Sequence, residues 1–235
     1  AKSGLLGTRI AVHTVAADTL PYRPYLFNLV VAADAPAPEL ARVLRPLGGR
    51  LVARAAGTVV LPGETLPPPA GFAFAFARGV VPGSGEWTHC YGDPGNTACS
   101  GDQLAFGDFA VLWYGPPGPR HMFQRHVKGA APLYRNGTVF VNGQDYLAGV
   151  DAYNGAVLWE KHLPGAGRMA LLKDCGNMVA ADDRLFVAVG GDCLVLAART
   201  GEELARHPVA TYAANGGKWG YVAAWQDLLV GSATR

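Results

Sequence analysis

Charged residues are scarce in this chain of 235 residues, in which Asp, Glu, Lys and Arg together make up 16%, against roughly 25% in an average soluble domain. The charges nearly balance, because the formal net charge is +2 and no basic run occurs, and this argues against a dedicated nucleic-acid-binding protein. No apolar stretch approaches the roughly 20 residues that a membrane-spanning helix needs. With 50% hydrophobic residues, the chain still has the apolar side chains for a folded core.

Cysteine is also rare. The four cysteines, Cys90, Cys99, Cys175 and Cys193, are too few for a disulfide scaffold at this length. None of their spacings is the C-x-x-C of a zinc or redox site, and no metal site is predicted. Cys90 and Cys99 could pair in an oxidising compartment, or all four could be reduced and mostly buried. Cytoplasmic and periplasmic locations therefore both remain open.

Glycine and proline, in contrast, are abundant. The chain has 31 Gly and 17 Pro, together about a fifth of its residues against roughly 12% in an average protein. This excess favours many short elements joined by turns over long helices. The fold class that we expect is mainly β, and the chain divides into regions of different pattern.

Residues 1–57 alternate strand and helix. Residues 25–32 form a near-continuous apolar run, which is typical of a strand covered on both faces in a parallel sheet. Pro38 can begin a helix, the pair at 48–49 is Gly-Gly and can end it, and residues 50–55 begin the next strand. This order predicts a strand–helix–strand unit.

This region resembles the C-terminal half of a class I S-adenosylmethionine-dependent methyltransferase, in residues 20–22 (LPY), 26–31 (LFNLVV) and 40–52 (LARVLRPLGGRLV). The resemblance implies a partial Rossmann-like α/β domain. It also implies that Asp18 and Leu20 lie near the adenine of bound S-adenosylmethionine.

Two features depart from the methyltransferase pattern. The family's acidic residue stands four positions before the Leu-Pro step, where this chain has Ala16, and Asp18 stands only two positions before it. The glycine-rich loop after the family's first strand, which holds the methionine end of the cofactor, is absent. For this chain alone we therefore expect no methyl transfer.

Residues 58–84 are a bridge rich in Pro and Gly that contains one predicted strand. Residues 71–77 (GFAFAFA) have a period of two, with the three phenylalanines on one face. This run is expected to be the last strand of the methyltransferase-like sheet. The sequence Pro-Gly-Ser-Gly at 82–85 then marks a boundary.

Residues 85–235 contain a repeat of hairpins. Residues 133–141 correspond to 179–187 at an offset of 46 and to 222–230 at a further 43, each with a polar turn between apolar arms. A period in the mid-forties is that of four-stranded propeller blades, of which this region would hold about three.

The segment 149–159 (GVDAYNGAVLW) resembles the eleven-residue repeat A-x-D-x-x-T-G-x-x-x-W of quinoprotein-type (PQQ-like) propellers. The matching positions are Asp151, Gly155 and Trp159 in the first copy and Thr200 and Gly201 in a second copy. The second copy is degenerate, because Ala197 and Ala205 replace its Asp and Trp. The resemblance implies a structural role for Trp159, which would dock on the neighbouring blade.

The whole chain resembles the fused methyltransferase and quinoprotein-like propeller proteins of some bacteria. The expected domains are a methyltransferase-like part at 1–57, the bridge at 58–84 and an incomplete propeller at 85–235. Because propellers have about four to eight blades, we expect the chain to be a fragment of a longer protein.

The candidate ligand-binding residues lie on one loop, which follows a strand expected at 110–114. They are Arg120, His121, Arg125 and His126. Two arginines and two histidines could bind an anionic ligand at the propeller mouth, or they could be solvated loop residues. The two histidines are five positions apart, which is not the helical i, i+4 spacing of a metal site. The quinone PQQ is not expected, because quinoproteins hold it with a vicinal cysteine pair and a calcium site, and the sequence has neither.

Three functions remain. The first is a binding or interaction scaffold for a protein or small-molecule ligand, fused to an incomplete methyltransferase-like domain. The second is part of an active S-adenosylmethionine-dependent methyltransferase whose propeller presents the substrate. The third is a quinoprotein-type dehydrogenase.

Overall fold

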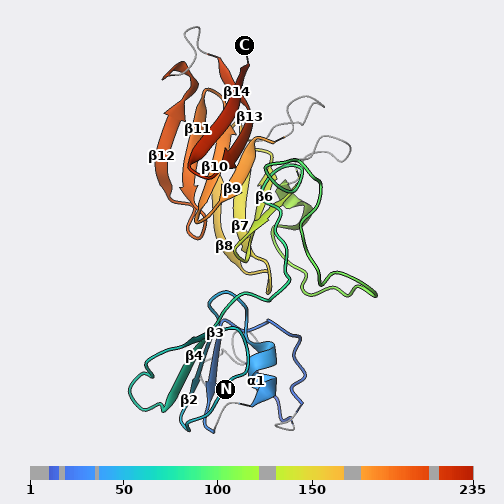
Figure 1. Cartoon of the computed structure of the whole chain (residues 1–235), viewed down its shortest axis with the longest axis vertical. Coiled ribbons are helices and arrows are strands. Elements are labelled where there is room, and N and C mark those ends of the chain that lie inside the picture. The colour runs from blue at the N-terminus through green and yellow to red at the C-terminus, as the bar shows by residue number, and fades with distance from the viewer. Residues whose placement is uncertain are drawn as a thin grey trace. The chain divides into compact units, whose positions relative to one another are not determined.

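The computed structural model describes residues 11–15, 19–34, 37–121, 131–166, 176–211 and 217–234 (Figure 1). The chain divides into two compact units, Ala1–Gly79 and Val80–Arg235. Among the described residues, no helix is long and apolar enough to cross a membrane.

The first unit is a small mixed sheet with one short helix (Figure 1). Its strands are β1 (Leu29–Ala32), β2 (Arg50–Ala53), β3 (Gly63–Thr65) and β4 (Phe74–Arg78), in the order β1-β2-β4-β3. Strands β1 and β2 are parallel and α1 (Pro38–Val43) connects them, which is the strand–helix–strand unit that the sequence predicts. Strand β4 comes from the bridge and pairs antiparallel with both β2 and β3.

The helix ends earlier than the glycine pair suggests. Pro38 does occupy its first turn, but α1 stops at Val43, and Leu44 is already extended with φ −73° and ψ 132°. Pro46 explains this, because a proline disfavours helical backbone at the residue before it. The prediction that Gly48 and Gly49 end the helix was therefore wrong.

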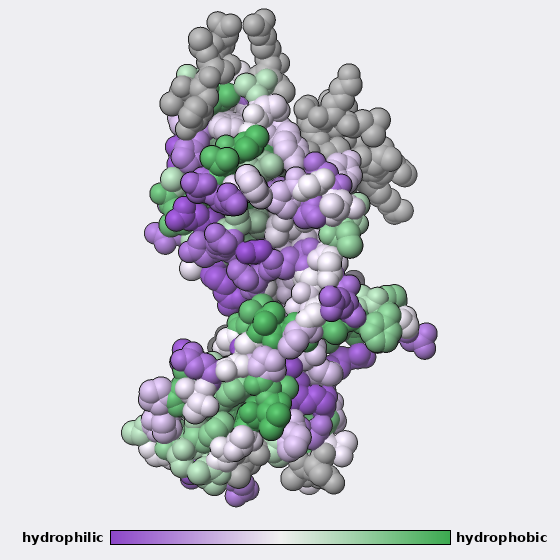
Figure 2. Space-filling model, in the orientation of Figure 1, coloured by the Kyte–Doolittle hydropathy of each residue, from purple (hydrophilic) through white to green (hydrophobic). Residues whose placement is uncertain are grey.

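The core of the first unit lies on the face of the sheet that meets α1. Phe74 and Phe76 of β4 pack there with Leu44, Leu51 and Ala53, all of them nearly inaccessible to solvent. The alternation along β4 thus places the rings of Phe74 and Phe76 in one core, as a period of two requires, whereas Phe72 precedes the strand and is only half-buried. Apolar side chains also remain exposed elsewhere on this unit, and Figure 2 shows hydrophobic residues grouped on its visible face.

The second unit contains two four-stranded antiparallel sheets, in which each strand pairs with the next along the chain, and a two-stranded sheet (Figure 1). The first sheet consists of β5 (Leu133–Arg135), β6 (Thr138–Gly143), β7 (Tyr146–Asp151) and β8 (Val157–His162). The second consists of β9 (Met178–Ala181), β10 (Arg184–Val189), β11 (Asp192–Ala197) and β12 (Glu203–Pro208). The two-stranded sheet pairs β13 (Lys218–Trp225) with β14 (Leu228–Thr234). Each of the two four-stranded sheets thus has the meandering form of a propeller blade.

The first hairpin of each sheet repeats as expected, but its third copy has a different register. Asn136, Asp182 and Gln226 each begin a turn with left-handed backbone, at φ 47°, 52° and 53°. The offsets between these turns are 46 and 44 residues. Because the turn fixes the register of a hairpin, the predicted offset of 43 for the third copy was wrong by one residue.

The hydrophobic cores of the second unit lie between its sheets. Leu133, Phe140 and Leu147 of the first sheet form one cluster with Leu185 and Leu196 of the second. A second cluster joins the other face of the second sheet to β13 through the residues Val179, Ala188, Val222 and Ala224. Each sheet is therefore held by packing against its neighbour, which is how blades bury their faces.

An extended segment at residues 86–89, here called the strap, ties the first strands of all three sheets together. Strand β9 contacts both β5 and β13, and successive strap residues bond to equivalent positions on the three strands. The pairs are Trp87 with Tyr134 (backbone bonds of 3.0 and 2.7 Å), the carbonyl of Thr88 with the N–H of Ala180 (2.9 Å), and Nε2 of His89 with the carbonyl of Ala224 (3.0 Å). The strap therefore fixes the three strands relative to one another.

Candidate functional site

Trp159 on β8 docks the first four-stranded sheet onto the second. Its indole Nε1–H donates to the carbonyl of Ala198 at 2.9 Å, across 39 residues of sequence. The ring lies between two glycines, because a Cβ added at Gly201 or at Gly149 would come within 2.6 or 2.4 Å of it. Its contacts are thus those of a residue that joins two blades.

The turn before Trp159 is shaped by Asp151. Its Oδ1 accepts the N–H groups of Tyr153 and Asn154 at 3.0 and 3.4 Å, and its carbonyl accepts that of Gly155 at 2.9 Å. Gly155 has φ +74°, which only glycine adopts without strain.

The second copy of this turn keeps the same backbone without the aspartate. Gly201 has φ +70° and its N–H donates to the carbonyl of Ala197 at 2.8 Å. The hydroxyl of Thr200 accepts the N–H of Glu202 at 3.4 Å. The degeneracy of this copy in sequence therefore leaves the turn intact, because its glycine and the backbone bonds are retained.

Trp113 is a functional equivalent of Trp159 that the sequence reasoning missed. Its Nε1–H donates to the carbonyl of Ala152 at 2.8 Å, and a Cβ at Gly155 would lie 2.4 Å from its ring. Trp113, Ala152 and Gly155 each precede their counterparts around Trp159 by 46 residues, so the repeat period could have revealed it. No strand is assigned at 110–114, so the strand expected there was wrong.

The loop that carries the candidate ligand-binding residues begins on a 3-10 helix, η1 (Gly118–His121), that is fixed against the β6–β7 hairpin. The carbonyl of His121 accepts the N–H of Gln144 at 2.9 Å, and Gly143 permits this approach, because a Cβ there would lie 2.3 Å from that oxygen. The imidazole of His121 stacks on the ring of Tyr146 with centroids 4.0 Å apart and planes at 14°. The blade thus holds this histidine in one orientation.

A cavity of about 290 Å³ opens beside this stacked pair. It is lined by two cations, two carboxylates, two histidines, an amide and a phenol, namely Arg120, His121, Gln144, Asp145, Tyr146, Glu160, Lys161 and His162. The structure thus brings two of the four predicted loop residues, Arg120 and His121, into one cavity. Arg125 and His126 lie outside the described residues.

Three of the four charged groups in this cavity are engaged within the protein. The carboxylate of Asp145 accepts the N–H of Gly165 at 2.8 Å, and that of Glu160 accepts the Tyr146 hydroxyl at 2.9 Å. The ammonium of Lys161 donates to the carbonyl of Gly201 at 3.2 Å. Arg120 has no carboxylate partner among the described residues, so its guanidinium is the group available to an anion.

Tyr146 remains a hydrogen-bond donor over the physiological pH range. Burial and, secondly, its hydrogen bond to Glu160 raise the pKa of its phenol to about 12. The hydroxyl is therefore kept neutral and holds Glu160 in place.

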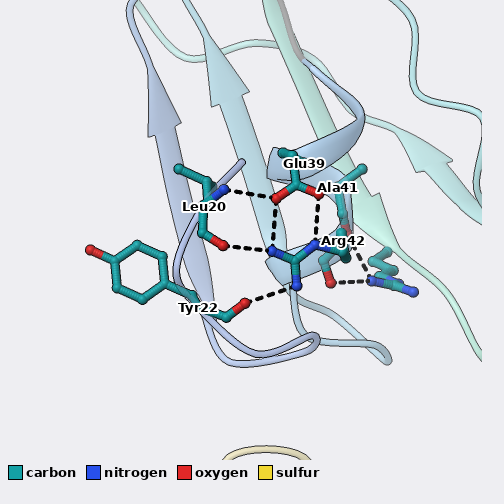
Figure 3. A network of polar contacts seen from close by, with 6 residues as sticks. Leu20, Tyr22, Glu39, Ala41 and Arg42 are labelled. Atoms are coloured by element: carbon teal, nitrogen blue, oxygen red, sulfur yellow. Dashed lines mark hydrogen bonds and ion pairs between the residues drawn. The ribbon is translucent and has the colours of Figure 1, made fainter. Parts of the chain in front are cut away.

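Leu20, the described residue of the predicted cofactor site, lies in a network of its own (Figure 3). Its N–H donates to Oε2 of Glu39 at 2.9 Å and its carbonyl accepts Nη2 of Arg42 at 3.0 Å. The bond from Arg42 and that from Leu20 lower the pKa of Glu39 to about 2. Both polar groups of the Leu20 backbone are thus used internally, and Asp18 lies outside the described residues.

No metal centre emerges from the part of the chain that is described, and its one buried cysteine is not an activated thiol. No group of three or more His, Cys, Asp or Glu side chains there could hold a metal ion. Cys193 is fully buried, and this burial raises the pKa of its thiol to about 12. Cys193 is therefore not a nucleophile at neutral pH.

Neither protein-family models nor curated proteins match the chain. Among solved structures, it is similar to a europium-containing methanol dehydrogenase, with 20% identity and a TM-score of 0.28 over 35% of this chain and 15% of that one. It is also similar to the quinohemoprotein alcohol dehydrogenase ADHIIG from Pseudomonas putida HK5, with 16% identity and a TM-score of 0.34 over 53% of this chain and 19% of that one. The chain thus spans less than a fifth of the length of either, and likenesses this distant assign no activity to it.

Proposed function

We propose that the unit at 80–235 is a binding scaffold of the quinoprotein-like propeller type, and that it holds a small anionic ligand in the cavity beside His121 and Tyr146. The observation that carries this proposal is that three of the four charged side chains in the cavity form hydrogen bonds within the protein and the fourth, an arginine, has no carboxylate partner among the described residues. The three are Asp145, Glu160 and Lys161, and the fourth is Arg120, which is exposed.

The frame of the cavity supports a binding role. Two of its walls are strands β7 and β8, which are paired over their length, and the third is η1, which is bonded to the hairpin through Gln144. A site on rigid strands loses little conformational entropy when a ligand binds. A guanidinium at the rim offers a carboxylate or phosphate two parallel hydrogen bonds.

The test titrates the whole chain with malonate and with inorganic phosphate. Binding of each probe is measured from the shifts of the backbone amide signals in ¹⁵N NMR spectra. Because hydrogen bonds to charged groups contribute about 1.5–3 kcal/mol, Arg120→Gln should weaken binding by about tenfold or more. Arg184→Gln is the matched control, because Arg184 is an exposed arginine on β10 that does not line this cavity. Equal weakening by both substitutions, or none by Arg120→Gln, would refute the proposal.

The second candidate function is that of a methyltransferase, of which the first unit would be one part. It is supported by the parallel pair β1–β2 with α1 between them and by β4 antiparallel beside β2, since parallel strand–helix–strand units form nucleotide-type cofactor folds. The residues at hand fit S-adenosylmethionine poorly, because the backbone of Leu20 is already bonded to Glu39 and Arg42. A radiolabelled methyl-transfer assay of the chain is expected to stay at background.

A quinone-dependent dehydrogenase is the third candidate. The described residues offer no donor set for its metal ion.

A further inference from the structure

The first unit has a cavity of its own, with a volume of about 390 Å³, within the range of small-molecule sites. It lies between the start of α1, the loop at 58–61 and the end of β4. Most of its lining is apolar, and the residues that matter here are Pro38, Val59, Leu61, Arg42 and Arg78. None of the described residues that line it is acidic.

Two arginines are the charged groups in the lining of this apolar cavity. Arg42 forms a two-pronged ion pair with Glu39, with both bonds at 2.7 Å, so that its charge is largely balanced. Arg78 is buried, and its Nη1 donates to the carbonyls of Ala41 and Leu44 at 2.8 and 2.7 Å. These bonds fix the guanidinium in place before any ligand arrives.

An aromatic ring and further arginines surround Arg78 in this unit. The guanidinium of Arg78 lies 4.7 Å from the centre of the Tyr25 ring, another residue of the lining. Residues 11–79 contain six arginines against four carboxylates, Asp18, Asp34, Glu39 and Glu64. An anion entering a low-dielectric cavity of this sign is attracted more strongly than it would be at the surface.

We infer that this cavity binds an organic anion with an apolar body. The carboxylate or sulfonate head would lie toward Arg78, and the hydrocarbon body would contact Pro38, Val59 and Leu61. The positively charged sulfonium of S-adenosylmethionine is not the chemistry that this lining favours. The ligand chemistry thus differs from that of the cofactor implied by the methyltransferase resemblance, and the cavity shares no lining residue with the cavity at Arg120.

The first experiment compares octanoate with octanol on the whole chain, by saturation-transfer NMR and by isothermal titration calorimetry. The two probes have the same hydrocarbon body and differ in the charge of the head group. Octanoate is expected to bind at least tenfold more tightly. Equal binding of the two, or no binding of octanoate, would overturn the inference.

Val60 provides a matched pair of variants at the rim. Its side chain lines the cavity but is 92% exposed, so neither Val60→Asp nor Val60→Lys should disturb folding. Since exposed charges interact by about 0.2–1 kcal/mol, Val60→Asp should weaken octanoate binding and Val60→Lys should strengthen it, each by up to about fivefold. A shift of both variants in the same direction contradicts an anion site. Arg120→Gln should leave octanoate binding unchanged, which separates this result from the fate of the propeller site.

Discussion

Replacement of Trp159 by phenylalanine should destabilise the second unit far more than the same change at an exposed tryptophan. The indole is 8% exposed, and its N–H bonds to the carbonyl of Ala198, which is itself buried. Phenylalanine fills most of the space between Gly149 and Gly201 but cannot donate to that carbonyl. The substitution therefore isolates the hydrogen bond that joins the two four-stranded sheets, together with a modest loss of buried area.

The magnitude follows from these two losses. A buried carbonyl left without its donor costs about 1–3 kcal/mol, and the smaller ring gives up about 1 kcal/mol of apolar burial. The free energy of unfolding should thus fall by about 2–4 kcal/mol. Trp225→Phe is the control, because Trp225 is 56% exposed on β13 and a surface change of this kind stays within about 0.5 kcal/mol.

Urea unfolding followed by tryptophan fluorescence measures this difference. All five tryptophans lie in the second unit, so the signal reports on that unit alone. Gly201→Ala provides an independent check, because its Cβ would lie 2.6 Å from the Trp159 ring on a backbone with φ +70°, and it should cost more than about 1 kcal/mol. If Trp159→Phe and Trp225→Phe differ by less than about 0.5 kcal/mol, the ring does not join the sheets as described.

Three further predictions concern pH and the neighbouring repeat. Burial lowers the pKa of His89 below 6.5, so the imidazole binds a proton more readily in the unfolded chain than in the folded one. The free energy of unfolding of the second unit should therefore fall as the pH drops below about 6.5. In urea melts at a series of pH values, His89→Gln should reduce this dependence of stability on pH. The pKa of Glu39 is lowered from 4.5 to about 2, so the first unit should lose stability as the pH falls from about 4.5 toward 2, and circular dichroism of Glu39→Gln should show no such loss. Trp113→Phe should lower the free energy of unfolding less than Trp159→Phe does in the same urea assay, because Trp113 is only half-buried.

The repeat could be predicted because its signals are local. Asn136-Gly137 and the segment from Asp151 to Trp159 each specify a turn within a few residues, and spacing alone places their counterparts 46 residues later. The register of the third hairpin was missed because apolar arms of similar composition align equally well when shifted by one residue. The polar turn at Gln226-Asp227, which is recognisable in the sequence, gives the correct offset of 44, and Gln226 has left-handed backbone there.

The candidate sites depend on contacts that sequence does not encode locally. Arg120 and His121 were recognised by residue type, but Glu160 and Lys161 reach the same cavity through the pairing of β7 with β8. The strap depends even more on contacts between distant parts of the sequence, because its His89 bonds to Ala224, which is 135 positions away. No pattern within either segment predicts this contact, because it forms only when the sheets pack together.

The docking tryptophan and the cavity at Arg120 are connected through strand β8. Strand β8 carries Trp159, which packs on Gly201, and also Lys161, whose ammonium bonds to the carbonyl of that same Gly201. Between them lies Glu160, which points to the other face of the strand, where it accepts the hydroxyl of Tyr146. A substitution that weakens the packing of Trp159 is therefore expected to shift Glu160 and Lys161, which line the cavity. A substitution at Trp225, which lies on β13, changes no residue of β8. Anion binding and inter-sheet stability should weaken together in Trp159→Phe, and if they separate, the cavity is held by η1 and the β6–β7 hairpin alone.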